Sequence, residues 1–109
     1  MTAPNDFRDR IAAMCRALHD LYASEFKRLG YHNPPAFTAE YGQKNVRIVV
    51  SDASSRSVYC FVEISTGDIL KAAGWKAPAK GKRGSIWNEN CDVGADKPCN
   101  LFGSGLYVR

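Results

Sequence analysis

Residues 56–72, RSVYCFVEISTGDILKA, decide the fold, because they read as two β-strands joined by a tight turn. The first strand, Arg56–Ile64, is rich in β-branched and aromatic residues. Its alternation predicts one face made of Val58, Cys60, Val62 and Ile64 and an opposite face made of Tyr59, Phe61 and Glu63. Gly67 in the turn Ser65–Asp68 is free to adopt positive φ, and Ile69–Ala72 is predicted as the returning strand.

Two further strands are predicted before this hairpin. Asn45–Ser51, NVRIVVS, is strongly β-branched, and Ala36–Tyr41 is a shorter candidate. Ser54 and Ser55 suit a turn between strands. Residues 36–72 therefore predict a strand meander, in which the three strands from Asn45 to Ala72 follow one another directly.

The region before the strands, residues 1–30, is predicted to be one long amphipathic helix over residues 5–29. Apolar residues recur there at steps of three and four: Phe7, Ile11, Cys15 or Met14, Leu18, Tyr22 or Leu21, Phe26 and Leu29. Asn5 is a candidate cap, Gly30 a candidate end, and the prolines in YHNPP, residues 31–35, stop the helix. The expected fold class is α+β: a long N-terminal amphipathic helix packed on a small, mainly antiparallel sheet. A second copy of the chain is an alternative or additional partner for the apolar face.

The length of 109 residues fits a single domain spanning residues 1–109. No apolar run reaches the roughly 20 residues of a membrane span, and the first residues, MTAPNDFRDR, do not read as a signal peptide. We therefore expect a cytoplasmic location.

The sequence favours neither a metal site nor an active site. Cys15 and Cys60 fall on predicted core faces, whereas Cys91 and Cys99 flank a loop and are the one plausible disulfide pair. Their spacing is wrong for zinc. Nucleophile-elbow, zincin and phosphate-loop motifs are missing from the sequence, and the sequence suggests no obvious catalytic carboxylate or thiol companion for either histidine. We expect no catalytic residues, no metal ligands and no cofactor.

The positive charge is concentrated in the last third of the chain. Residues 65–109 carry seven of the fifteen bases but four of the eleven acids. The segment KAAGWKAPAKGKRGSIW, residues 71–87, has five cations, no acid, and Trp75 and Trp87. Residues 75–85 are predicted to be a loop, residues 85–90 a short strand or helical turn, residues 91–105 a flexible loop and residues 106–109 a terminal strand. Basic and glycine-rich loops are therefore expected over residues 73–109.

This basic segment has the groups that a phosphate-bearing ligand needs. Lysine and arginine bind phosphates, and tryptophan provides a stacking face for a base. Asn88 and Asn90 are placed to read a base edge. We expect Trp87 to be the ligand ring and Trp75 a core anchor, because Trp75 directly follows the sheet. The alternative is a solvated loop whose lysines confer solubility.

About half of the chain resembles a family of small bacteriophage proteins. The shared pattern is R-S-V-x-x-F-x-x-x-x-T-G-D-I-x-K-A-A-x-W-K-A-P-A-K-x-x-R-G-x-I, followed by a glycine-rich loop and a closing aromatic residue and arginine; here it starts at Arg56. The family is identified as that of the Thoeris anti-defence proteins. The resemblance implies a sponge that sequesters a cyclic ADP-ribose variant, or a cyclic oligonucleotide, without cleaving it. It also implies a homo-oligomer in the host cytoplasm. The stretch CDVGADKPCN, residues 91–100, departs from the pattern.

Three hypotheses follow. The first is a phage anti-defence sponge for a cyclic nucleotide, and the second is a phage accessory protein that binds single-stranded nucleic acid. The third is a structural or host-interaction protein without a small ligand. The expected ligand-binding residues are Arg56, Lys71, Lys76, Lys80, Arg83, Trp87, Asn88 and Arg109.

Overall fold

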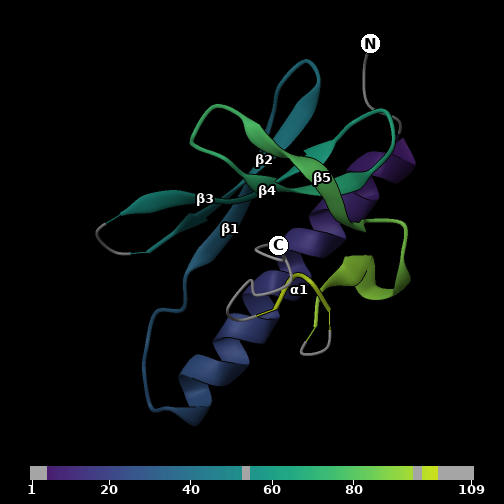
Figure 1. Ribbon diagram of the computed structural model, residues 1–109. Coiled ribbons are helices and arrows are strands. Elements are labelled where there is room, and N and C mark those ends of the chain that lie inside the picture. Colours follow the sequence, from purple (N-terminus) through teal and green to yellow (C-terminus); the bar gives the residue numbers. More distant parts are fainter. Residues whose placement is uncertain (1–4, 53–54, 95–96, 101–109) are drawn as a thin grey trace.

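The computed structural model describes residues 5–52, 55–94 and 97–100 and shows one helix against one sheet (Figure 1). Helix α1 spans Asn5–Arg28. The strands that follow are β1 Ala36–Tyr41, β2 Asn45–Ser51, β3 Arg56–Glu63, β4 Asp68–Ala72 and β5 Pro78–Ser85, and a short turn of helix, η1, covers Glu89–Asp92. The predicted α+β fold is confirmed.

The sheet is a five-stranded antiparallel meander in the order β1-β2-β3-β4-β5. Each strand pairs with the next one along the chain, as short connections between antiparallel strands allow. In the turn between β3 and β4, Gly67 adopts a φ of 79° and its N–H donates to the Glu63 carbonyl. The predicted meander is therefore confirmed and extends one strand further than expected.

Helix α1 ends at Arg28, and Gly30 closes it as predicted. Gly30 has a φ of 78°, its N–H donates to the Lys27 carbonyl, and the Tyr31 N–H donates to the Phe26 carbonyl. This pair of hydrogen bonds forms a glycine-dependent helix cap. Leu29, which was expected on the apolar face, is 48% exposed, because it lies beyond the last turn of α1.

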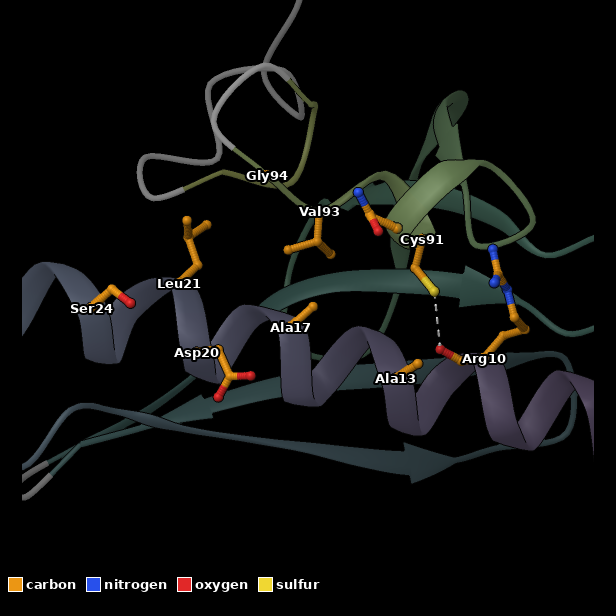
Figure 2. Close-up of a pocket in the computed structure, with 10 residues that line it drawn as sticks. Arg10, Ala13, Ala17, Asp20, Leu21, Ser24, Cys91, Val93 and Gly94 are labelled. Atoms are coloured by element: carbon orange, nitrogen blue, oxygen red, sulfur yellow. Dashed lines mark hydrogen bonds between the residues drawn. The ribbon is translucent and has the colours of Figure 1, made fainter.

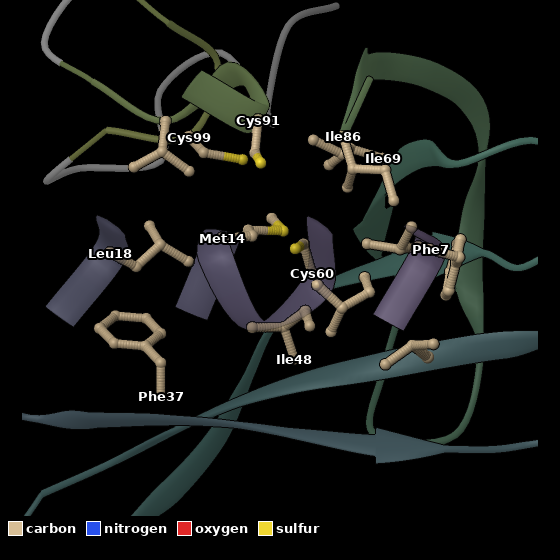
Figure 3. Close-up of a cluster of buried hydrophobic side chains, with 14 residues drawn as sticks. Phe7, Met14, Leu18, Phe37, Ile48, Cys60, Ile69, Ile86, Cys91 and Cys99 are labelled. Carbon is tan, nitrogen blue, oxygen red and sulfur yellow. The ribbon is translucent and has the colours of Figure 1, made fainter. Parts of the chain in front are cut away.

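The hydrophobic core lies between α1, one face of the sheet and the segment around η1 (Figure 3). The buried face of the helix consists of Phe7, Ile11, Met14 and Leu18, so Met14 rather than Cys15 is the fully buried member of its turn. The sheet contributes Phe37, Val46, Ile48, Cys60, Val62 and Ile69 to the same cluster. The apolar face of α1 is thus covered within a single chain from Phe7 to Leu18, whereas Leu21 and Tyr22 are only partly buried.

A β-bulge in β3 breaks the predicted alternation of that strand. Ile48 pairs with Cys60, but Val49 pairs with Val58, so Tyr59 is an extra residue in β3. The Tyr59 ring contacts the Phe37 ring at 5.5 Å and joins the core. The prediction that Val58 shares the face of Cys60, opposite Tyr59, is therefore wrong.

The prediction of a loop over residues 75–85 is also wrong. Residues 78–85 form β5, which pairs with β4 through Ile69 and Gly84, Leu70 and Lys82, and Ala72 and Pro78. Two register shifts interrupt this pairing. Backbone pairing with β4, rather than a hydrophobic pattern, makes this segment a strand.

The described part of the expected flexible loop over residues 91–105, residues 91–94 and 97–100, packs on the core. Cys91, Val93 and Cys99 are all buried. The backbones of Val93 and Cys99 pair in an isolated parallel β-bridge. Asn90, Cys91 and Asp92 have φ values of 54°, 55° and 56°, which makes one left-handed turn of non-glycine residues. All four cysteines are free thiols, so the considered Cys91–Cys99 disulfide is not formed. The predicted strand at residues 106–109 lies outside the described residues.

Candidate ligand-binding face

The candidate site lies on the outer face of the sheet, which is the face turned away from α1. Val46, Ile48, Val62 and Ile69 face the core, so their neighbours in β2, β3 and β4 face outward. Strand register then aligns one cross-strand row over all five strands, in the order Glu40, Arg47, Phe61, Leu70, Lys82. The row places charged residues at both edges and apolar residues at its centre.

Two arginines on this face share one carboxylate. Arg47 Nη1 donates to Glu40 Oε1 at 2.9 Å, and Arg56 Nη2 donates to Glu40 Oε2 at 2.7 Å. The guanidinium of Arg56, followed by that of Arg47, holds the pKa of the Glu40 carboxyl below its usual value. Two cations against one anion leave a net positive charge at this point of the sheet.

The Trp75 ring lies against the same two arginines. It comes from the turn between β4 and β5, where the N–H groups of Ala73 and Gly74 both donate to the Ala77 carbonyl. The guanidinium carbons of Arg47 and Arg56 are 4.9 and 5.6 Å from the ring centroid. Trp75 is nevertheless 40% exposed, so its expected role as a core anchor is wrong. We call Glu40, Arg47, Arg56 and Trp75 the arginine–tryptophan cluster.

A small cavity adjoins this cluster. Its volume is about 260 Å³, and its lining includes Glu40, Arg47, Phe61 and Lys76. Lys76 directly follows Trp75 in the turn and is exposed. The cavity therefore brings the positive charges of Arg47 and Lys76 to one place, and the aromatic side chain of Phe61 also lines it.

The structure brings together two of the eight predicted ligand residues. Arg56 belongs to the arginine–tryptophan cluster, and Lys76 lines the adjoining cavity. Lys80 is exposed on β5, and Lys71 shares the helix-side face of β4 with Ile69. Arg83 follows Lys82 on β5, and within the described part of the chain its buried Nε has no hydrogen-bond partner. Arg109 lies outside the described residues.

Trp87 and Asn88, the remaining predicted residues, lie at a different place, beside the first half of α1. Arg10 donates to the carbonyls of Ile86 and Asn88 at 2.7 and 2.6 Å, and its guanidinium carbon is 5.9 Å from the Trp87 ring centroid. The Asn88 side-chain amide donates to the Asp92 carboxylate at 2.9 Å. These contacts attach residues 85–92 to the helix, and Trp87 is 49% exposed at their edge.

Sequence reasoning missed Glu40 and Arg47. Both sit at outward positions of predicted strands, where a charged residue normally faces solvent. Their meeting depends on the register that sets Glu40 opposite Arg47. The available signal was the lone arginine inside NVRIVVS, a charge in an otherwise apolar run.

A second, larger hollow lies between α1 and residues 90–94 (Figure 2). It has a volume of about 530 Å³, with Ala13, Ala17 and Leu21 on the helix side and Cys91 and Val93 opposite. The Cys91 thiol donates to the Arg10 carbonyl at 3.5 Å, and burial raises the pKa of this thiol. Burial therefore disfavours the thiolate of Cys91, which is the nucleophilic and metal-binding form of cysteine.

Within residues 5–52, 55–94 and 97–100, no cluster of three or more His, Cys, Asp or Glu side chains could hold a metal ion. None of the helices found in this same part of the chain is both long and apolar enough to span a membrane.

Comparison with known proteins identifies a family. A family described as being of unknown function (DUF7717) matches residues 3–108, which is nearly the whole chain, and the chain belongs to this family. No curated protein and no solved structure matches the chain.

Proposed function

We propose that the protein binds phosphate-bearing nucleotides on the outer face of its sheet, without chemical turnover. The observation that carries this proposal is the meeting of Trp75 with Arg47 and Arg56 on an exposed surface. Arginine recognises phosphate oxygens through two parallel N–H donors, and an exposed indole stacks on a base. The arginine–tryptophan cluster therefore places phosphate-binding guanidinium groups in direct contact with a stacking ring.

Single-stranded nucleic acid is the ligand class that the shape of this face favours. Antiparallel sheets bind single strands by stacking unpaired bases on exposed aromatic rings, while cations track the backbone. Arg56 and Trp75 are open to solvent here, and Lys76 and Lys80 continue the positive charge into the β4–β5 turn and β5. An open surface of this kind accepts a strand that enters and leaves the site.

A cyclic nucleotide is the second candidate ligand, and the cavity beside Trp75 favours it. A space of about 260 Å³ lined by Arg47 and Lys76 is smaller than most small-molecule pockets, and in this proposal it holds the phosphate end of one nucleotide unit. In this form the protein is a phage anti-defence sponge that holds a cyclic ADP-ribose variant or a cyclic oligonucleotide in the host cytoplasm. A homo-oligomer, which would enclose the ligand more fully, is part of this second proposal.

Binding measurements separate the two candidates. The same protein is tested in two ways. Fluorescence anisotropy measures binding of a labelled single strand of about 15 nucleotides, and calorimetry measures binding of cyclic ADP-ribose and of a cyclic dinucleotide. Strand binding is expected to weaken steeply with salt, because counterions are released along the backbone. A cyclic nucleotide bound more tightly than the strand, with a shallow salt dependence, would select the sponge.

Variants test the position of the site. Arg56→Ala is expected to weaken strand binding about tenfold, whereas Lys27→Ala, an equal change of charge at the end of α1, leaves it nearly unchanged. Equal losses in both variants would mean that binding depends on overall charge and not on this face. The absence of any binding to strand or cyclic nucleotide would refute the proposed function.

A further inference from the structure

Glu40 occupies the position that a ligand anion would take in the arginine–tryptophan cluster. Its two carboxylate oxygens accept from two different guanidinium groups, at 2.9 Å from Arg47 and 2.7 Å from Arg56. Both of these guanidinium groups also lie against Trp75. In the free protein, the charges expected to bind phosphate are therefore already engaged.

The chemistry of this carboxylate matches that of a phosphodiester. Each group carries one negative charge shared by two terminal oxygens, and each accepts hydrogen bonds from paired guanidinium donors. A phosphodiester that replaced Glu40 would leave the charge balance of the cluster unchanged. A neutral sugar or base has no such group and could not make this exchange.

We propose that Glu40 is an internal substitute for the ligand phosphodiester: it holds Arg47 and Arg56 beside Trp75 in the free protein and is displaced when the ligand binds. This inference rests on the proposed function, because it concerns the same site. It names the recognised group, a phosphodiester, whether this belongs to a single strand or to a cyclic dinucleotide.

The surroundings of Glu40 permit the exchange. Its side chain is 40% exposed and sits on β1, which is an edge strand, so the displaced carboxylate can be hydrated. Exposed ion pairs of this type contribute little to stability, so breaking two of them does not threaten the fold. Competition by Glu40 then makes binding weaker than the two arginines alone would allow, and more selective for anions.

The test compares Glu40→Gln with Glu25→Gln. Both variants remove one negative charge from an arginine ion pair, but Glu25 pairs with Arg28 at the end of α1, and neither residue belongs to the arginine–tryptophan cluster. The probes are a labelled oligothymidylate, a cyclic dinucleotide and inorganic phosphate. Glu40→Gln is expected to tighten binding of the phosphodiester probes at least about threefold relative to Glu25→Gln, because the internal competitor is lost.

Three outcomes would overturn the inference, and they differ in what else they reject. If the unaltered protein binds the probes and Glu40→Gln binds no tighter than Glu25→Gln, Glu40 does not compete with ligand, while the proposed function stands. If neither the unaltered protein nor Glu40→Gln binds any probe, the proposed function itself fails. A gain seen with inorganic phosphate but with neither phosphodiester would reject the named ligand group. Thermal melts confirm that each variant is folded.

Discussion

A β-carbon placed on Gly84 would lie 2.7 Å from the Oδ2 atom of Asp92, so the absence of a side chain in β5 makes room for a buried carboxylate. The same Oδ2 atom accepts from the Ser85 N–H at 2.8 Å and from the Asn88 amide at 2.9 Å. These hydrogen bonds hold the left-handed turn of residues 90–92 against the end of β5.

Gly84→Ala is therefore expected to destabilise the protein by about 1–3 kcal/mol, because Asp92 must move away from its donors to relieve the clash. Gly74→Ala is the matched control, since no atom lies within 4 Å of a β-carbon placed there. Urea unfolding measures both. Equal stability of the two variants would show that the Asp92 contact does not restrain the fold.

Arg10→Ala is expected to destabilise the protein by about 1–3 kcal/mol, because it removes the Arg10 donor from the Ile86 carbonyl and one of two donors from the Asn88 carbonyl, which keeps its hydrogen bond from the Cys91 N–H. Arg16, an exposed residue of the same helix, provides the control, and Arg16→Ala should change stability by less than about 0.5 kcal/mol. Thermal melts at equal protein concentration make the comparison. A similar loss of stability in both variants would indicate an effect of the removed helix charge, and not the loss of the hydrogen bonds between Arg10 and the segment after β5.

The helix and four of the strands could be predicted because their side chains carry a regular pattern. Phe7, Ile11, Met14 and Leu18 repeat with helical spacing, and β2 is rich in β-branched residues. β5 could not be found in this way, because PAKGKRGS contains no apolar alternation and two register shifts interrupt its pairing. The bulge at Tyr59 could not be predicted either, because a prediction from alternating side chains assumes that the strand register is unbroken.

The site was only partly predictable, because it depends on contacts between strands. Arg56 and Lys76 could be selected from composition and motif, but the sequence does not show that both lie near Glu40 and Arg47. The two tryptophans of the basic segment, residues 71–87, also lie at different places in the structure. Trp75 turns toward the arginines of β2 and β3, whereas Trp87 lies beside Arg10 of α1.

Cys15 is expected to resist alkylation in the folded protein. Burial raises the pKa of this thiol to about 11, so at pH 8 only about 0.1% is the reactive thiolate. The labelling rate with iodoacetamide should rise about tenfold for each pH unit between pH 7 and pH 10. Mass spectrometry of timed samples measures this rate, with the urea-unfolded chain as the control. Labelling of Cys15 in the folded chain at the unfolded rate would contradict its burial.

The two tryptophans are expected to have different roles: changing Trp87 to alanine should lower stability, and changing Trp75 to alanine should weaken binding. Trp87 packs on Gly67, where a β-carbon would lie 2.4 Å from its Nε1 atom, and Arg10 lies beside its ring. Trp87→Ala should therefore cost about 1–3 kcal/mol of stability, less than a fully buried ring. Trp75→Ala leaves these contacts intact and removes the stacking face beside Arg47 and Arg56. It should weaken nucleotide binding about 5- to 150-fold, which corresponds to one lost base stack.

Urea unfolding and strand anisotropy on the same two preparations decide between these roles. Trp75→Phe is the control for ring identity, and it should keep most of the binding because phenylalanine also stacks on a base. The expectation that Trp87 is the ligand ring remains testable in this experiment. A loss of binding in Trp87→Ala with stability unchanged, together with full binding in Trp75→Ala, would move the site from the arginine–tryptophan cluster to the side of α1, where Arg10 and Asn88 would be its polar groups.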